Sequence, residues 1–258
     1  MLIDKGAPLA LFLFAHQDDE FGVFAQIELE LREGRQVCCV YVTDGAATAN
    51  EDRREAESQA VLQKLGVPTK NIHFVGRQLC IGDGQLHKST NLLATWLYQF
   101  SDAHPALETC FVPAWEGGHP DHDLLHAVAV RLLGGRYGHV KIWQYPLYNG
   151  RNCYGPFFRL QSPLPENGSV DRKSIGLLDR LRYVGLCLSY PSQWRTWLGL
   201  FPFACFNYLF VGVQQLQSVD RLRLNQPPHV RPLYYERRAF LDWPTLRAAV
   251  ESIDIDKK

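Results

Sequence analysis

Leu9-Ala10-Leu11-Phe12-Leu13-Phe14 is an unbroken apolar run, and the polar run Ala15-His16-Gln17-Asp18-Asp19-Glu20 follows it directly. An apolar run of this length between polar residues predicts a strand that is buried on both faces, which is typical of parallel sheets covered by helices. The polar run would then lie at the carboxyl end of the first strand. Open α/β sheets bind their ligands at that edge.

A second polar cluster repeats this arrangement a hundred residues later. Residues 108–115 read as a strand, Glu116-Gly117-Gly118 as a turn, and His119-Pro120-Asp121-His122-Asp123 as the start of a helix. The carboxyl ends of parallel strands share one edge of a sheet, so we expect the two clusters to face each other.

Imidazole and carboxylate groups are the usual nitrogen and oxygen ligands of a catalytic Zn²⁺. Each cluster alone is also typical of a capped helix start, but the two together favour a metal-dependent hydrolase. Consecutive side chains diverge along an extended segment, so Asp18 and Asp19 cannot both face the metal. One would bind the metal, and the other would transfer protons.

The rest of the first 145 residues alternates between predicted strands and helices. The further strands are expected at 36–42, 71–75, 108–112 and 140–145, and the helices at 20–33, 51–65, 88–100 and 121–133. This order predicts an α/β fold with a Rossmann-like, mostly parallel sheet and helices on both faces. No Gly-x-Gly-x-x-Gly follows the first strand, which argues against a dinucleotide site.

After Pro146 the pattern is less regular. Residues 148–172 read as a long loop that would help to wall the substrate cleft, and a helix is expected at 172–188. The stretch 194–210 is rich in aromatic residues. Core packing is the favoured interpretation, with sugar stacking or a membrane-facing patch as alternatives. The stretch is too short to span a bilayer.

Composition limits the class of protein. A chain of 258 residues with 46% hydrophobic and 21% charged residues predicts a single globular domain over 1–258. Lys plus Arg and Asp plus Glu both number 27, so nothing indicates a nucleic-acid partner. The first six residues lack the shape of a signal peptide, and the seven cysteines include adjacent Cys38 and Cys39 in a predicted buried strand. These features predict a cytoplasmic protein; the oligomeric state stays open.

The two clusters resemble the motifs AHPDDE and HPDH of the PIG-L (LmbE-like) family of zinc-dependent N-acetyl-sugar deacetylases. Further matches, in the family's order and approximate spacing, are Val42-Thr43-Asp44-Gly45, Arg54-x-x-Glu57, Leu65-Gly66 and Asp83-Gly84. The resemblance covers about residues 8–150, which would form the metal-binding α/β core, with a substrate-cleft region at about 150–258. Beyond that range it rests chiefly on Tyr190-Pro191-Ser192-Gln193.

The resemblance implies a role for each matched residue. The Zn²⁺ ligands would be His16, Asp19 and His122. Asp18 would be the general base that deprotonates the metal-bound water, His119 would stabilise the oxyanion, and Asp121 would orient a histidine. Fe²⁺ or Co²⁺ can replace zinc at such a site. From the residues alone, Asp44 and Asp123 are equally available to orient a histidine.

Several positions leave alternatives open. Gln17 replaces the usual proline, and Gly117 stands where some family members have a tyrosine. Arg54 either binds a substrate phosphate or hydroxyl, or is a surface charge paired with a glutamate of its own helix. His126, one helical turn after His122, is a second candidate ligand.

The resemblance implies a zinc-dependent hydrolase that removes the acetyl group from an N-acetylated sugar or sugar conjugate. Two alternatives are an amidohydrolase acting on a non-sugar or thiol-conjugate amide and a catalytically silent binding protein. The partner would be a small-molecule substrate, and a membrane-linked substrate stays open.

Overall fold

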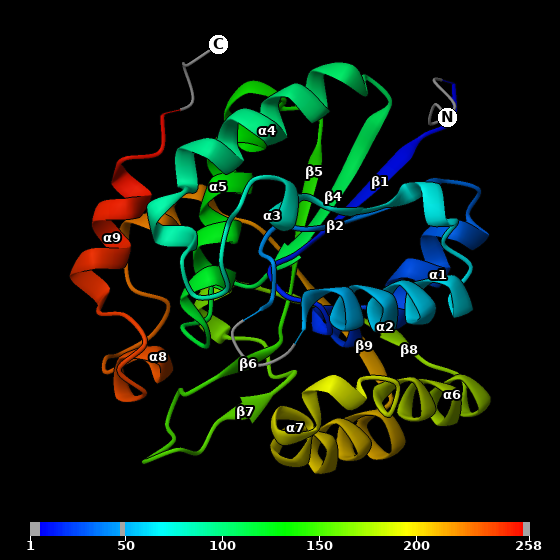
Figure 1. Cartoon of the computed structure of the whole chain (residues 1–258). Coiled ribbons are helices and arrows are strands. Elements are labelled where there is room, and N and C mark those ends of the chain that lie inside the picture. Colours follow the sequence, from blue (N-terminus) through cyan, green and yellow to red (C-terminus); the bar gives the residue numbers. More distant parts are fainter. Residues whose placement is uncertain (1–5, 47–49, 255–258) are drawn as a thin grey trace.

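The computed structural model describes residues 6–46 and 50–254, so the first five residues of the N-terminal stretch considered above lie outside it. A seven-stranded sheet with the order β3-β2-β1-β4-β5-β9-β8 forms the centre of the molecule (Figure 1). Its strands are β1 Leu9–Phe14, β2 Gln36–Tyr41, β3 Ile72–Phe74, β4 Leu107–Pro113, β5 Lys141–Tyr145, β8 Val170–Ser174 and β9 Val213–Ser218.

The first five strands are parallel, and β9 and β8 continue the sheet in antiparallel pairing. The predicted α/β fold with a mostly parallel sheet is therefore confirmed. β1 lies between β2 and β4, and all six of its side chains are buried. Alternate residues of β1 pack into different cores, Leu11 on one face and Phe12 on the other, which explains the unbroken apolar run.

Helices cover both faces of the sheet (Figure 1). One layer contains α4 Thr90–Ala103, α5 Pro120–Arg136 and α9 Trp243–Glu251. The other contains α1 Phe24–Arg32, α2 Glu51–Lys64, α6 Leu177–Cys187 and α7 Trp194–Phe206. Shorter elements are η1 Asp19–Gly22, η2 Thr69–Asn71, α3 Val75–Gln78, η3 Leu86–Lys88, β6 Tyr148–Asn149, β7 Arg159–Leu160, η4 Pro165–Asn167, η5 Pro191–Gln193, η6 Asn207–Val211, η7 Arg221–Asn225 and α8 Tyr234–Arg237.

Two predicted helices begin several residues too early. The helix expected from residue 20 begins only at Phe24, because Asp19–Gly22 forms a 3₁₀ turn first. The helix expected from 172 begins at Leu177, because Arg172–Ser174 belongs to the edge strand β8. The last four side chains of β8 are exposed, so the strand has no apolar pattern, and its pairing with β9 determines its structure.

The region after Pro146 contains more regular structure than the sequence predicts. The expected loop at 148–172 includes the paired strands β6 and β7, the turn η4 and the start of β8. No helix among the described residues is long and apolar enough to cross a bilayer. The cytoplasmic location stays a prediction. All seven cysteines are free, and Cys38 and Cys39 are buried in β2.

Candidate metal centre and pocket

The loop after β1 turns sharply at Asp18, whose φ is +123°. The next carboxylate folds back on the loop, because Asp19 Oδ2 accepts a hydrogen bond from the backbone N–H of His16 at 2.8 Å. The backbone N–H of Asp18 donates to Glu20 Oε2 at 3.0 Å. Asp18 and Asp19 therefore point to different partners, as the divergence of consecutive side chains predicts.

His16 and Asp19, in the loop after β1, converge with His122 in the first turn of α5. His122 Nε2 lies 3.0 Å from Asp19 Oδ1 and 3.2 Å from His16 Nδ1. The three buried residues offer one ligand atom each within 4.8 Å of one another. Two imidazole nitrogens and one carboxylate oxygen are a donor set that fits Zn²⁺. The structure thus brings the three predicted ligands together.

The charges of this group are coupled. Burial favours the protonated form of Asp19, but the charge and hydrogen bond of His122 outweigh it and lower the pKa of Asp19 to about 2. Burial opposes a charge on His16 as well, yet the neighbouring carboxylates, Asp83 first, raise the pKa of His16 well above its usual value. The carboxylates around His16 therefore stabilise the protonated form of its imidazole.

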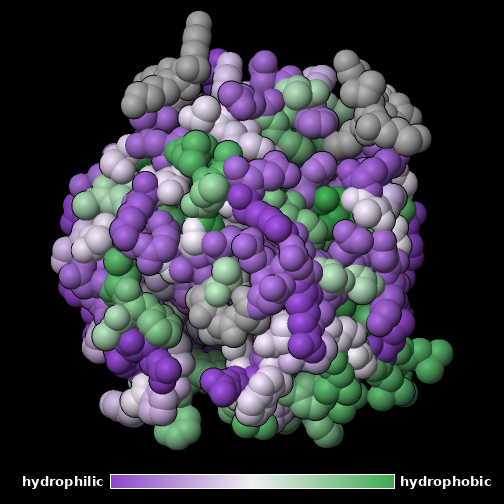
Figure 2. Space-filling model, viewed as in Figure 1, coloured by the Kyte–Doolittle hydropathy of each residue, from purple (hydrophilic) through white to green (hydrophobic). Residues whose placement is uncertain are grey.

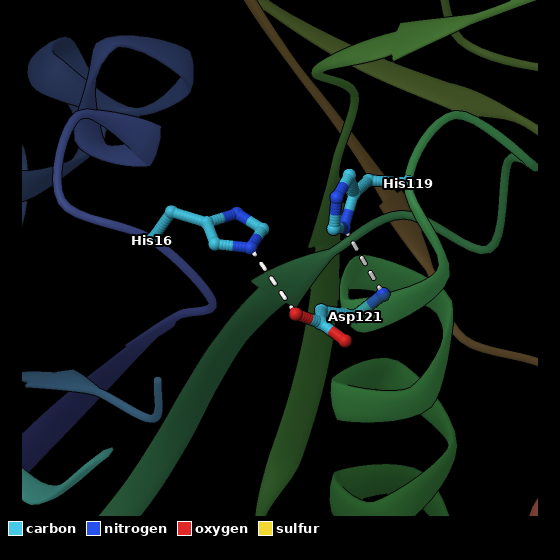
Figure 3. Close-up of side chains that lie close together, drawn as sticks. All are labelled: His16, His119 and Asp121. Atoms are coloured by element: carbon cyan, nitrogen blue, oxygen red, sulfur yellow. Dashed lines mark hydrogen bonds and ion pairs between the residues drawn. The ribbon is translucent and has the colours of Figure 1, made fainter. Parts of the chain in front are cut away.

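The far side of the His16 ring contacts two carboxylates. Its Nε2 lies 3.3 Å from Asp121 Oδ2 and 3.2 Å from Asp83 Oδ1, and Figure 3 shows the first of these contacts. The backbone N–H groups of Gly84 and Leu86 fix the Asp121 carboxylate at 2.7 and 3.2 Å. Carboxylates at Nε2 favour a proton there, which leaves the Nδ1 lone pair for a metal.

Sequence reasoning assigned no role to Asp83. This residue lies in a loop after α3, and only the folding of the chain brings it to His16.

The other two candidates for orienting a histidine, Asp44 and Asp123, have different partners. Asp44 accepts the backbone N–H of Ala46 at 2.9 Å, and Asp123 accepts that of Glu116 at 3.0 Å.

His119 caps the start of α5. Its Nδ1 accepts a hydrogen bond from the backbone N–H of Asp121 at 3.2 Å, so the proton of the neutral ring lies on Nε2 (Figure 3). The ring is nearly perpendicular to that of His16, with 4.5 Å between centroids. Burial and the charge of His16 lower the pKa of His119 to about 3, so this ring is a neutral hydrogen-bond donor.

His126, the alternative ligand, does not face this group. It is buried further along α5, and its Nδ1 lies 2.9 Å from the carbonyl oxygen of Pro113. Burial lowers the pKa of His126 to about 4. The geometry favours His122 over His126 as the ligand.

Asp18 is buried beside the metal group with partners of its own. Trp197 donates its indole N–H to Asp18 Oδ2 at 3.1 Å, and Arg54 Nη2 lies 3.8 Å from Asp18 Oδ1. Burial raises the pKa of Asp18 to about 8, with Arg54 opposing the shift. A carboxyl group that titrates near neutral pH is typical of functional sites.

Arg54 is buried in the site, and it is the exposed Arg53 that pairs with Glu57 of the same helix. The two terminal nitrogens of Arg54 donate to the backbone carbonyls of Gly45 and Gln17, the second at 3.0 Å. This guanidinium therefore ties together two loops of the site. Its contact with substrate stays a prediction.

Gln17 stands at the position of the family's usual proline and restrains the loop after β1 in a different way. Its side-chain amide donates to the carbonyl oxygens of Thr43 and Asp44, each at 3.3 Å. The side chain is fully buried. Hydrogen bonds to the loop after β2 thus restrain the backbone here, where a proline ring would fix φ.

The comparison with known families agrees with this geometry. Residues 11–133 match the family model described as PIG-L, GlcNAc-PI de-N-acetylase. The chain is thus similar to the PIG-L family over this stretch, the PIG-L segment, which is just under half of its length. It contains both motifs, Arg54 and Asp83. The description of this family model names a de-N-acetylase, which is a hydrolase that cleaves an amide carbon–nitrogen bond.

The fold that this chain shares with solved structures extends beyond the PIG-L segment. A zinc-inhibited form of the teicoplanin deacetylase Orf2 has 17% identity and a TM-score of 0.62, covering 82% of this chain and 98% of its own. The N,N'-diacetylchitobiose deacetylase of Pyrococcus horikoshii has 16% identity and a TM-score of 0.56, covering 88% of each chain.

GalB of Pseudomonas putida KT2440, a 4-carboxy-2-hydroxymuconate hydratase, also shares the fold. It has 15% identity and a TM-score of 0.50, covering 87% of this chain and 98% of its own. No curated protein matches the chain. Since the same fold occurs in deacetylases and in a hydratase, the structural likeness shows the fold alone.

The pocket in front of the metal group measures about 430 Å³. Its lining from the PIG-L segment consists of His16, Asp18, Asp19, Phe21, Arg54, Asp83, Gly84, Gln85, His119, Pro120 and His122. The rest of the lining comes from beyond the segment, from Tyr148, Gln193, Thr196, Leu200 and Phe240. Residues after 146 therefore line the pocket from β6, which lies in the expected loop, and also from η5, α7 and the loop after α8.

One residue of this outer wall, Gln193, lies in a segment that the sequence analysis matched to the family. Gln193 ends the quoted segment Tyr190-Pro191-Ser192-Gln193, and its side-chain amide donates to the carbonyl oxygen of Gln17. Trp197 lies in the aromatic stretch, where core packing was favoured. That interpretation holds for Trp197 and Tyr208, which are buried, and was wrong for the exposed Trp194, Phe203, Phe206 and Phe210.

Proposed function

We propose that this chain removes the acetyl group from an N-acetylated sugar or sugar conjugate and uses Zn²⁺ held by His16, Asp19 and His122. One observation carries the proposal: three buried donor atoms converge beside a separate buried carboxylate, Asp18, in a pocket of about 430 Å³. A bound Zn²⁺ lowers the pKa of water toward about 7 and polarises the amide carbonyl. The donor set also accepts Fe²⁺ or Co²⁺.

The side chains around the metal group have different roles, and Asp18 transfers the protons. Asp18 is the general base: its Oδ2 is held by the indole of Trp197, so Oδ1 takes the proton from the attacking water. The raised pKa of Asp18 suits a group that must later return this proton to the leaving amine.

The neutral ring of His119 supports the carbonyl side of the reaction. Its Nδ1 is occupied by the backbone of Asp121, so Nε2–H is the donor for the developing oxyanion. Asp121 and Asp83 hold the Nε2–H of His16 and keep its Nδ1 aimed at the metal position. Arg54, in the same pocket, would contact a polar substituent of the substrate.

The family description and the named deacetylases support a sugar amide as substrate. The proposal retains the small-molecule substrate, the single domain over 1–258 and the cytoplasmic location. The balance of charges gives no support for a nucleic-acid partner.

Asp18→Asn tests the mechanism. The variant should keep its zinc and lose about 10²–10⁴-fold in kcat, because the amide cannot take the proton. The measurement is acetate released from N-acetylated sugars and from acetamides without a sugar, with metal content per chain determined in parallel. Full activity in a zinc-loaded Asp18→Asn protein would refute the base, and cleavage of the non-sugar amides alone would refute the substrate class.

A further inference from the structure

Helices α6 and α7 and the turn η6 pack together and expose a group of large apolar side chains. We call it the α6–α7 patch, formed chiefly by Leu178, Leu181, Trp194, Leu198, Phe206 and Phe210. Leu178, Leu198 and Phe210 are 82%, 72% and 74% exposed. Figure 2 shows an apolar surface at the lower right, where Figure 1 places these helices. Apolar patches of this kind mark interaction or membrane sites.

Helix α7 is apolar on both sides. Its inward side chains Trp197, Leu200 and Ala204 are buried in the core. Its outward face should then carry polar residues, as in an ordinary surface helix, yet Arg195 is the only charged residue in 194–211. No helix among residues 6–46 and 50–254 is long and apolar enough to cross a membrane, so this helix suits the surface of a bilayer rather than its interior.

The charges on the patch are mostly positive. Residues 177–211 contain Arg180, Arg182 and Arg195 against Asp179 alone, a net charge of three minus one, or +2. Arg182 pairs with Asp179 and with Glu28 of α1, and the Arg180 guanidinium donates to the backbone carbonyl oxygens of Ile175 and Leu209. Arg195 is therefore the exposed positive charge of the patch. The Arg195 guanidinium lies 5.5 Å from the ring centre of Trp194 and pairs with no carboxylate of a described residue. Tryptophan beside arginine is typical of helices that lie in the membrane interface.

We propose that the α6–α7 patch docks this protein onto the surface of a lipid bilayer with anionic headgroups. The apolar side chains enter the acyl boundary, and Arg195 meets the phosphates. A second copy of the chain is a poorer occupant, because a twofold contact would place the same positive patch on both partners.

Docking would also orient the pocket. Thr196 and Leu200, which line it, are on the same helix as Trp194 and Leu198. The pocket therefore lies beside the membrane contact. This docking does not depend on the proposed deacetylation, because it uses only exposed side chains outside the pocket.

Vesicle sedimentation tests the proposal with the full chain. Wild-type protein should sediment with vesicles of phosphatidylcholine and phosphatidylglycerol, and less with phosphatidylcholine alone. Leu198→Glu and Phe210→Glu should each bind the mixed vesicles about tenfold more weakly. Leu222→Glu is the matched control: Leu222 is also 72% exposed but lies on η7, and its variant should bind like the wild type.

Three outcomes would overturn the proposal. The wild type could stay in the supernatant with both vesicles, or Leu222→Glu could lose as much binding as Leu198→Glu. Light scattering could instead show a wild-type dimer that Leu198→Glu dissociates, which would make the patch a contact between copies. Activity on a water-soluble acetamido sugar, measured separately, should be unchanged in Leu198→Glu, so a failure of docking is distinguishable from a failure of the proposed function.

Discussion

The indole nitrogen of Trp197 donates a hydrogen bond to Asp18 Oδ2 at 3.1 Å across 179 residues of sequence. Two neighbouring rings fix the indole. It stacks on Tyr190 with 5.3 Å between ring centroids, and it makes a T-shaped contact with Phe21 with 5.4 Å between ring centroids. A helix outside the PIG-L segment thus holds the carboxylate that we propose as the base.

Trp197→Phe should keep the ring packing and remove the N–H donor. Loss of a hydrogen bond to a charged group is worth about 1.5–3 kcal/mol, so we expect kcat to fall by about 10–100-fold. KM and metal content should be unchanged, because the ligands are intact. Trp194→Phe, on the exposed side of the same helix, is the control for steady-state kinetics. Equal kcat in the two variants would contradict a positioning role for Trp197.

His122→Ala and His126→Ala separate the two candidate ligands on α5. Purified without added metal or chelator, the wild type and His126→Ala should contain zinc, and His122→Ala almost none, because only His122 faces His16 and Asp19. Elemental analysis per chain gives the answer. Zinc retained in His122→Ala and lost in His126→Ala would reverse the assignment.

Glu116 should make stability depend on pH. This fully buried carboxyl accepts the backbone N–H groups of Leu147 and Tyr148 at 2.6 and 2.9 Å, and burial raises the pKa of Glu116 to about 8. The folded chain then keeps a proton that the unfolded chain releases near pH 4.3. Between these values unfolding releases a proton, so the free energy of unfolding falls as pH rises, by up to about 1.4 kcal/mol per unit.

Glu116→Gln should remove this contribution. The side-chain amide oxygen of the variant can still accept the two N–H groups, and urea unfolding from about pH 5 to 8 should give a flatter profile than the wild type. Glu251→Gln, a change at an exposed side chain, should keep the wild-type slope. A wild-type slope in Glu116→Gln would show that Glu116 is ionised in the fold.

Gly76 allows a close approach between α3 and the loop after β2. A Cβ at this position would lie 2.1–2.4 Å from backbone atoms of Thr43, so Gly76→Ala should destabilise the fold by about 2–3 kcal/mol. Gly185 is exposed within α6, and a Cβ there meets nothing within 4 Å. Gly185→Ala should stabilise by about 0.5–1 kcal/mol in the same urea titration. Equal effects would argue against the close approach.

The centre of the parallel sheet could be predicted because β1, β2 and β4 are almost entirely buried. β1 and β4 carry long apolar runs, and the polar clusters at their carboxyl ends meet because these strands are neighbours. β8 could not be predicted, since the sequence Val-Asp-Arg-Lys-Ser has no periodic apolar face and β9 alone specifies the pairing.

In the site, too, some residues could be predicted from the sequence and others could not. His16, Asp19 and His122 could be proposed from two short motifs, because residue type and spacing carry the information. Asp83 and Trp197 could not, because an aspartate before a glycine and a tryptophan in an apolar helix are also ordinary features of turns and cores. Only the folded chain places them at His16 and Asp18.

The contact between Asp18 and helix α7 also concerns the design of shortened proteins. A fragment ending near residue 150 would retain every candidate metal donor, and it would lack both Gln193 and Trp197, which contact the loop after β1. Such a fragment would be a metal binder without its proton acceptor in place. The proposed reaction therefore needs residues both from the first 150 residues and from the region after them.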